Sequence, residues 1–240
     1  MVYSRTGTVT GSMCDCTVKL SHVAIFQLVQ DGVTDLMGDL HIDGLTAMHE
    51  YNAMWVFVKN IIRIFHRPDW RTQYFLHSFI SGHSSAKLFI DTEILAGPNL
   101  LPVAQSRLEL CALDLETGKI RKANTVGVQE DTPCEPELNG LKFSRFIHQD
   151  TEQTGSVKVQ FTNLDYCSHT NNIEYIRFIL NTYQAKDLID KDINQIEVHY
   201  GHQTFEGDTL FVARSKSENQ DYFTITSSNS IASECLIRWK

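Results

Sequence analysis

The segment Thr162-Asn163-Leu164-Asp165-Tyr166-Cys167-Ser168-His169-Thr170-Asn171-Asn172-Ile173-Glu174-Tyr175-Ile176 gathers an Asp, a His and two adjacent Asn residues within a few positions. The residues that lead into it, 157–162, alternate and are rich in β-branched side chains, which predicts a strand. The residues that follow carry apolar side chains at helical spacing. The polar cluster therefore falls where a strand gives way to a helix, and the N–H groups of such a junction point at any developing negative charge.

The pattern Asp165-x-x-x-His169-x-Asn171-Asn172, followed by an aromatic-rich helix, resembles the acyl-acyl carrier protein thioesterases, a family of two fused hotdog domains. In the usual family motif an Asn lies between the Asp and the His, and this chain has Cys167 there. A second catalytic position of the family, a Glu in a Tyr-x-x-Glu context, aligns with Tyr200-Gly201-His202-Gln203. The resemblance thus places Gln203 where the family has that Glu.

The first half of the chain resembles the same family. Asn52-Ala53-Met54-Trp55-Val56 matches the Asn-x-x-Trp-Val start of a long strand, and residues 115–120 match a Thr-Gly hairpin. The resemblance therefore covers nearly all of the chain. It implies an α+β protein made of two fused hotdog domains, each an antiparallel sheet wrapped around a long helix.

The resemblance implies that Asp165 and His169 activate the water that attacks a thioester. His169 is the better general base, because an unperturbed histidine titrates near neutral pH. In an alternative, Asp165 is itself the base or the nucleophile in an apolar acyl tunnel. The sequence does not choose between the two.

The two departures from the family motif limit what the corresponding side chains can do. Gln203 keeps a hydrogen-bonding side chain that can position water, but it cannot take a proton. Cys167 has two interpretations: a thiolate nucleophile beside a protonated His169, or a small buried hydrophobic residue.

Four further residues are candidates for substrate binding. Backbone amides near Asn171 and Asn172 are placed to hold the carbonyl oxygen, and the same Asn residues are also typical helix caps. Asn52 and Trp55 match the family pattern, in which Asn52 would face a cavity. A hydrogen-bonded amide at a strand end is the alternative for Asn52.

Residue patterns along the chain predict two similar halves. Ser21 can cap a helix at 21–37, and Pro133, Pro136 and Gly140 indicate a linker. We expect an N-terminal domain at 1–130, a linker at 131–150 and a C-terminal domain at 151–240, with the helix of the latter at 172–183. The predicted strands are 54–65, 73–80, 87–95, 103–113, 120–128, 155–162, 195–204, 208–215, 222–227 and 230–239. A helix before a set of antiparallel strands, twice, gives an α+β chain.

Composition excludes several classes of protein. The formal net charge of −8 argues against general affinity for nucleic acid. No run of about 18 apolar residues is present to span a bilayer, and the N-terminus lacks an apolar signal region, so we expect a cytoplasmic protein. The six cysteines are scattered, which favours reduced thiols, and Cys14-Asp15-Cys16 does not have the spacing of a structural zinc site. We expect no metal and no cofactor.

The sequence therefore predicts an acyl-ACP thioesterase that releases a free fatty acid from an acyl carrier protein. An acidic carrier would need a local basic patch for docking, from either of two sets: Lys59, Arg63, Arg67 and Arg71, or Lys119, Arg121 and Lys122. An acyl-CoA thioesterase and a non-catalytic acyl-thioester sensor are the alternatives. The fused halves already supply the pairing of two hotdogs, so a monomer or a homodimer is expected.

Overall fold

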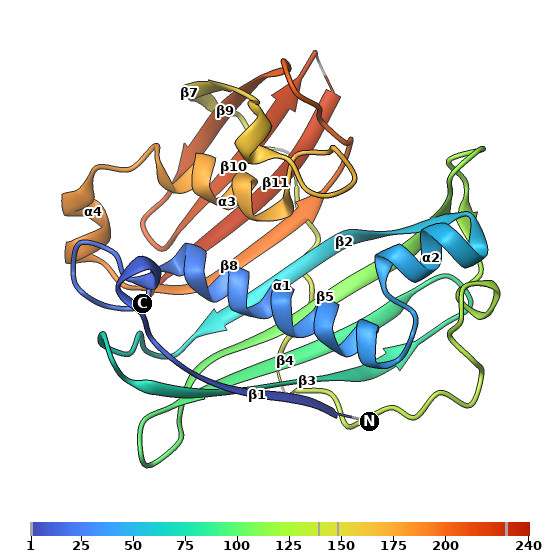
Figure 1. The fold of residues 1–240 in the computed structure, drawn as a ribbon. Helices are drawn as coiled ribbons and strands as arrows, with labels where there is room; N and C mark the ends of the chain where they lie inside the picture. The colour runs from blue at the N-terminus through green and yellow to red at the C-terminus, as the bar shows by residue number, and fades with distance from the viewer. Residues whose placement is uncertain (1, 139, 148, 229) are drawn as a thin grey trace. The chain divides into compact units, whose positions relative to one another are not determined.

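The computed structural model describes residues 2–138, 140–147, 149–228 and 230–240. The chain divides into two compact units, Met1–Leu141 and Lys142–Lys240, which we call the N-terminal and the C-terminal unit. Each unit contains an antiparallel sheet and one main helix (Figure 1). The α+β class predicted from the sequence is therefore confirmed.

The sheet of the N-terminal unit has the strand order β1-β3-β4-β5-β2, and every neighbouring pair is antiparallel. Its strands are β1 (Val2–Thr8), β2 (Ala53–Ile64), β3 (Gln73–His83), β4 (Leu88–Ala96) and β5 (Leu101–Asp114), and the short β6 (Ile120–Arg121) pairs with β5. Helix α1 (His22–Asp39) lies across one face of this sheet, and α2 (Gly44–Tyr51) follows it (Figure 1).

Helix α1 forms where predicted, because the Ser21 cap and the apolar face both favour a helix in this segment. The Ser21 side chain accepts a hydrogen bond from the Ala24 N–H at 3.1 Å, which satisfies one of the unpaired donors at the helix start. Gly32 lets the helix approach β3 closely, since a Cβ there would lie 2.6 Å from the Ser78 Oγ. The core of the unit contains Val33, Leu36, Met37, Ile80, Leu88, Ile90, Leu108 and Leu110.

The sheet of the C-terminal unit has the order β8-β11-β10-β9-β7, again antiparallel throughout. Its elements are β7 (Glu152–Lys158), α3 (Asn172–Leu180), α4 (Ala185–Asp190), β8 (Ile193–Tyr200), β9 (Thr209–Lys216), β10 (Gln220–Ser227) and β11 (Ser230–Trp239). Helix α3 buries Ile173, Tyr175, Ile176, Phe178 and Ile179. The apolar residues whose spacing predicted this helix thus form the face that packs against the rest of the unit.

Several predicted boundaries were wrong. The strand predicted at 155–162 ends at Lys158, and Phe161–Asn163 form a 3-10 turn instead. The strand predicted at 195–204 ends at Tyr200, so Gln203 lies in a loop. Only Ile120–Arg121 of the strand predicted at 120–128 is extended, because Ala123–Thr125 turn and Gly127 has a φ of 92°.

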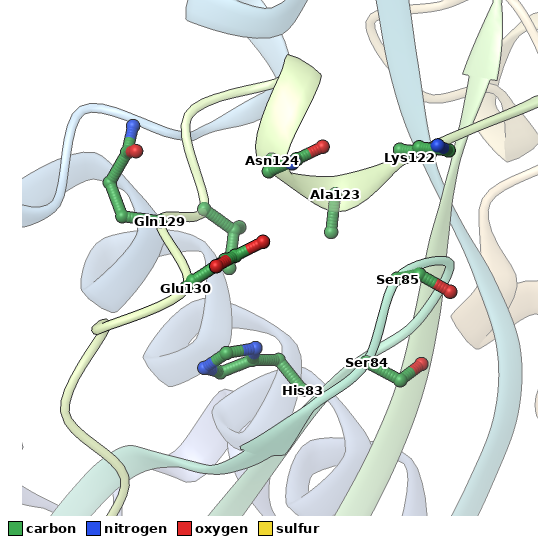
Figure 2. Close-up of a pocket in the computed structure, with 9 residues that line it drawn as sticks. His83, Ser84, Ser85, Lys122, Ala123, Asn124, Gln129 and Glu130 are labelled. Carbon is green, nitrogen blue, oxygen red and sulfur yellow. The ribbon is translucent and has the colours of Figure 1, made fainter.

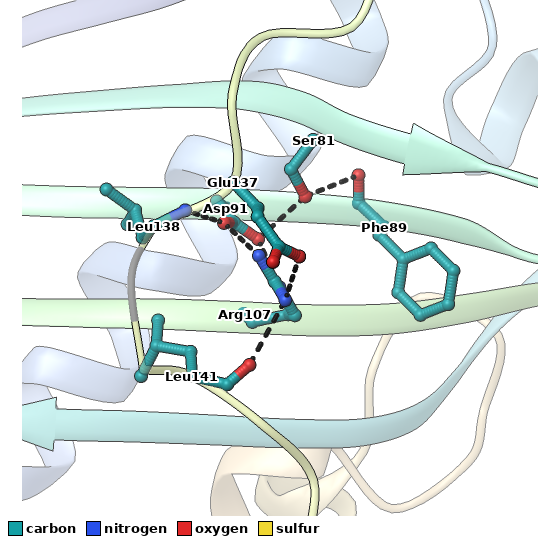
Figure 3. Close-up of polar contacts among 7 residues, drawn as sticks. All are labelled: Ser81, Phe89, Asp91, Arg107, Glu137, Leu138 and Leu141. Carbon is teal, nitrogen blue, oxygen red and sulfur yellow. Dashed lines mark hydrogen bonds and ion pairs between the residues drawn. The ribbon is translucent and has the colours of Figure 1, made fainter.

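A buried charged cluster fastens the end of the N-terminal unit to its own sheet (Figure 3). The Arg107 guanidinium donates to both carboxylate oxygens of Asp91, at 2.9 and 2.8 Å, and Asp91 is 0% exposed. Arg107 also donates to Glu137 and to the Leu141 carbonyl, and Asp91 accepts from the Leu138 N–H at 2.8 Å. Glu137, Leu138 and Leu141, in the middle of the predicted linker 131–150, are therefore held to β4 and β5.

Candidate active site

Asp165 organises the tight loop that precedes α3. Its Oδ1 accepts hydrogen bonds from the main-chain N–H groups of Cys167 at 2.8 Å and of His169 at 3.1 Å. The Asp165 N–H donates to the His169 carbonyl at 2.8 Å, and Ser168 takes a positive φ of 62° to close the turn. An Asp favours such a loop because its side chain can replace main-chain partners. We call residues 164–172 the Asp165 corner.

The second carboxylate oxygen of Asp165 is not used by the loop. Within the described ranges, Oδ2 makes no hydrogen bond, whereas Oδ1 makes two. Asp165 is half-buried. The loop therefore presents one carboxylate oxygen for another partner.

His169 is positioned by its main chain and by one aromatic neighbour. Its ring stands edge to face against Phe205, with centroids 5.1 Å apart and planes at 74°. Neither ring nitrogen hydrogen-bonds to any residue that the structure describes. The imidazole is thus free to bind a water molecule or a substrate atom. Asp165 holds the His169 main chain and not its ring, so the two side chains do not form a hydrogen-bonded dyad.

The start of α3 lies directly after His169. The Asn171 side chain caps the helix by accepting from the Ile173 N–H at 3.1 Å, as one alternative from the sequence had it. Asn172 is the first helical residue and is half-buried. The Asn172 N–H makes no hydrogen bond to the described residues, which leaves one donor at the positive end of the helix.

A buried set of hydroxyl groups ties the corner to the loop that carries Gln203. The Thr170 N–H donates to the Thr204 carbonyl at 2.8 Å, and the two hydroxyls are 2.6 Å apart. The Tyr175 hydroxyl lies 2.8 Å from the Thr204 Oγ1. Gln203 and His169 each precede one of the joined threonines, so the structure brings their main chains together. Gln203 is exposed.

The environment of Cys167 disfavours a thiolate. Burial, together with the nearby Asp165 carboxylate, raises the pKa of the Cys167 thiol. A nucleophilic cysteine needs the opposite, a positive or polar surrounding that lowers the pKa. The geometry therefore supports the small-hydrophobe interpretation of this residue.

Asn52 and Trp55 belong to the N-terminal unit. Asn52 ends α2 with a positive φ of 50°, and its Nδ2 donates to the Glu116 Oε1 at 3.3 Å. Trp55 is a half-buried residue of β2 that packs against the core. Both residues thus have structural roles, and their part in substrate binding stays a prediction.

The basic residues considered for docking are partly engaged elsewhere. Arg67 pairs with Asp15, Arg63 donates to the Gly140 carbonyl at 2.8 Å, and Arg121 donates to the Tyr51 carbonyl. Lys119 and Lys122 are exposed. The second set therefore offers the more accessible cations.

The N-terminal unit also contains a cavity of about 290 Å³, lined by residues that include His83, Ser84, Ser85, Lys122, Gln129 and Glu130. Figure 2 shows the His83 ring extending away from the two serine hydroxyls, which point to the opposite side. The Ser84 Oγ accepts from the Ala86 N–H at 3.4 Å. A serine nucleophile and a histidine base are therefore not brought together there.

The described residues lack the features of two other classes of site. No three His, Cys, Asp or Glu side chains in the described ranges are grouped as metal ligands. Among the described helices, none has the length and apolar character needed to cross a membrane.

Comparison with solved structures identifies the fold. The chain superposes over its whole length on an acyl-ACP thioesterase from Bacteroides thetaiotaomicron VPI-5482, with a TM-score of 0.91, 16% identity and 98% of that chain covered. A 12:0-ACP thioesterase from Umbellularia californica gives a TM-score of 0.80 at 13% identity, covering 100% of this chain and 97% of that one. This chain therefore has the double hotdog fold, as predicted.

The C-terminal part of the sequence is similar to a known family. Residues 147–240 match the family model described as the Acyl-ACP thioesterase C-terminal domain. This match includes the Asp165 corner and Gln203, and it confirms the resemblance predicted from the motif. No curated protein is significantly similar to the chain in sequence.

Proposed function

We propose that this protein is a thioesterase that hydrolyses fatty acyl thioesters of an acyl carrier protein, using the Asp165 corner. The observation that carries the proposal is the His169 imidazole, whose ring nitrogens are unbonded within the described ranges and which precedes the start of α3. The family match of residues 147–240 supports the same reaction.

In the proposed reaction His169 removes a proton from water as the water oxygen attacks the thioester carbonyl carbon. The carbonyl oxygen becomes negative, and the Asn172 N–H at the helix start is a donor for it. A well-placed donor of this kind contributes roughly 3 kcal/mol. The C–S bond then breaks, and the imidazolium returns its proton to the thiolate, giving a free acid and a thiol.

Asp165 has two roles in this reaction, one for each carboxylate oxygen. Its Oδ1 maintains the loop, whereas its Oδ2 is open to the attacking water. A nucleophilic Asp165 would instead form an anhydride with the acyl group. A single turnover in ¹⁸O-water tests for the anhydride: if water opens it at the Asp165 carbonyl carbon, the first product carries an unlabelled oxygen from the protein, which direct attack by water never gives.

The carrier is proposed from the family description. Because this protein has a net charge of −8, docking of an acidic carrier protein would need a local cationic patch. The exposed Lys119 and Lys122 are the candidates. Pantetheine is common to carrier-protein and CoA thioesters, so the carrier must be tested directly.

The test is thiol release from matched acyl carrier protein and CoA thioesters by wild type, His169→Ala and the control His202→Ala. His202 is an exposed histidine three positions before Phe205. We expect the His169 variant to lose at least about 100-fold in kcat/KM while the control stays near wild type. Faster turnover of the CoA series would overturn the carrier assignment, and binding without hydrolysis by wild type would overturn the enzyme.

A further inference from the structure

The N-terminal unit contains a second copy of the Asp165 corner. Residues 14–22, which we call the Asp15 corner, follow a 3-10 turn at Gly11–Met13 just as the Asp165 corner follows one at Phe161–Asn163. Asp15 N donates to the Lys19 carbonyl at 3.0 Å, as Asp165 N does to His169. The shared features continue in matching pairs: the bridges Cys14–Leu20 and Leu164–Thr170, the φ of 62° at Val18 and Ser168, and the helix caps Ser21 and Asn171.

The loop that faces each corner is matched as well. Leu20 N donates to the Pro68 carbonyl at 2.9 Å, as Thr170 N does to Thr204 at 2.8 Å. Three residues beyond these acceptors the chain takes a positive φ in both copies, at Arg71 and Gly207. The residues immediately before the acceptors, Arg67 and Gln203, therefore occupy the same position.

The two copies use their Asp side chains differently. Asp15 Oδ1 accepts from the Thr17 N–H at 2.9 Å, as Asp165 Oδ1 accepts from Cys167. Asp15 Oδ2, however, is bound by the Arg67 Nη1, which also donates to the Leu20 carbonyl at 3.2 Å. The Arg67 side chain is only 9% exposed.

The ionisation of Asp15 agrees with this contact. Burial opposes its negative charge, but the hydrogen bonds from Thr17 and the Arg67 guanidinium outweigh burial and hold the pKa of Asp15 below its usual value. The Asp15 carboxylate is therefore charged and paired with the Arg67 guanidinium. Lys19 stands where His169 stands, so this copy lacks the imidazole that is the general base of the proposed reaction.

We propose that the Asp15 corner is a silenced copy of the active site, closed by Arg67, and that the side chain at position 203 decides whether the Asp165 corner is open to substrate and water. The inference rests on the proposed function. It assigns Gln203 as a positioning residue whose neutral side chain leaves Asp165 Oδ2 available.

The test transfers the closing residue into the active copy. Gln203→Arg places an arginine on a backbone that the Asp15 corner shows can accept one. We expect kcat/KM to fall at least about 100-fold, because an Arg–carboxylate pair would occupy the open oxygen. Gln203→Met, of similar size and without charge, should lose much less. Equal losses in both variants, or an active Gln203→Arg, would overturn the inference.

A second readout does not depend on turnover. We expect Gln203→Arg to raise Tm relative to wild type and Asp165→Asn to abolish that rise, because the new pair needs the carboxylate. The reciprocal variant, Arg67→Gln, should lower Tm and keep kcat/KM within about twofold. Absence of coupling between positions 165 and 203 counts against the inference. If wild type hydrolyses no thioester, the proposed function itself is wrong. Failure of the proposed function is therefore distinguishable from failure of this inference.

Discussion

Asp165 binds His169 through the main chain: its Oδ1 lies 3.1 Å from the His169 amide nitrogen. The same oxygen holds the Cys167 N–H at 2.8 Å. The carboxylate therefore fixes the position of the His169 main chain. Phe205 contacts the imidazole ring and orients it. In this loop Asp165 Oδ1 has a structural role, and Oδ2 is left for the proposed reaction.

Asp165→Asn tests that separation. An Asn keeps an oxygen that can accept both N–H bonds, so we expect the free energy of unfolding to change by less than about 1 kcal/mol. The activity should fall at least about 100-fold, because the charge at Oδ2 is lost. Thermal denaturation and thioester turnover measure the two effects. Asp165→Ala is the control and should lose both stability and activity; an active Asp165→Asn would make the carboxylate purely structural.

Cys167→Ser should leave the reaction intact. The thiol is kept protonated by burial and by Asp165, so it does not supply a nucleophile. We expect kcat/KM within about threefold of wild type, and little inactivation by iodoacetamide at neutral pH. Rapid alkylation of Cys167 that parallels loss of activity would instead restore the cysteine as a reacting group.

The Asp91–Arg107 pair predicts a large effect on stability. Arg107→Ala leaves a fully buried Asp91 without its ion-pair partner, and we expect a loss of about 3–5 kcal/mol in urea unfolding. Glu137→Ala is the matched control, because the Glu137 side chain is 63% exposed, and it should cost less than about 1 kcal/mol. Replacing Asp91 and Arg107 together by Leu should recover part of the loss; a double variant less stable than Arg107→Ala would contradict this account.

Glu197 predicts a dependence of stability on pH. Its buried carboxylate accepts from the Ser144 N–H at 2.6 Å and lies 3.0 Å from the His199 Nε2. Burial opposes the charge, but the hydrogen bonds from His199 and Ser144 outweigh it and lower the pKa of Glu197 below its ordinary value of 4.5. A lowered pKa stabilises the fold above the unfolded-state value and loses that effect as pH falls through the folded-state value.

The measurement is the difference in free energy of unfolding between wild type and Glu197→Gln from pH 7 to pH 3. We expect a constant difference at higher pH that shrinks below about pH 4.5. Carboxylates that titrate alike in both proteins cancel when the two free energies of unfolding are subtracted. A difference that grows in acid would show that the pKa of Glu197 is raised.

The sequence alone located the Asp165 corner, α1 with its Ser21 cap, and β11, because caps and hydrophobic periodicity are local properties. It did not reveal β1, whose residues are exposed or half-buried and which pairs with β3 at the end of the strand order, nor the short helix α2. The less exposed residues of β1 are Tyr3, Arg5 and Gly7, which are not uniformly apolar, so the sequence lacks the apolar–polar alternation by which a half-buried strand is recognised.

The difference between the two corners was decided by tertiary structure. Arg67 and Gln203 are distant in sequence from Asp15 and Asp165. Long-range contacts, among them the hydrogen bonds of Leu20 to Pro68 and of Thr170 to Thr204, bring each loop beside its corner. The sequence therefore determined which residue types could do chemistry. Which carboxylate oxygen is paired and which is open depends on contacts between residues far apart along the chain, and no local pattern encodes them.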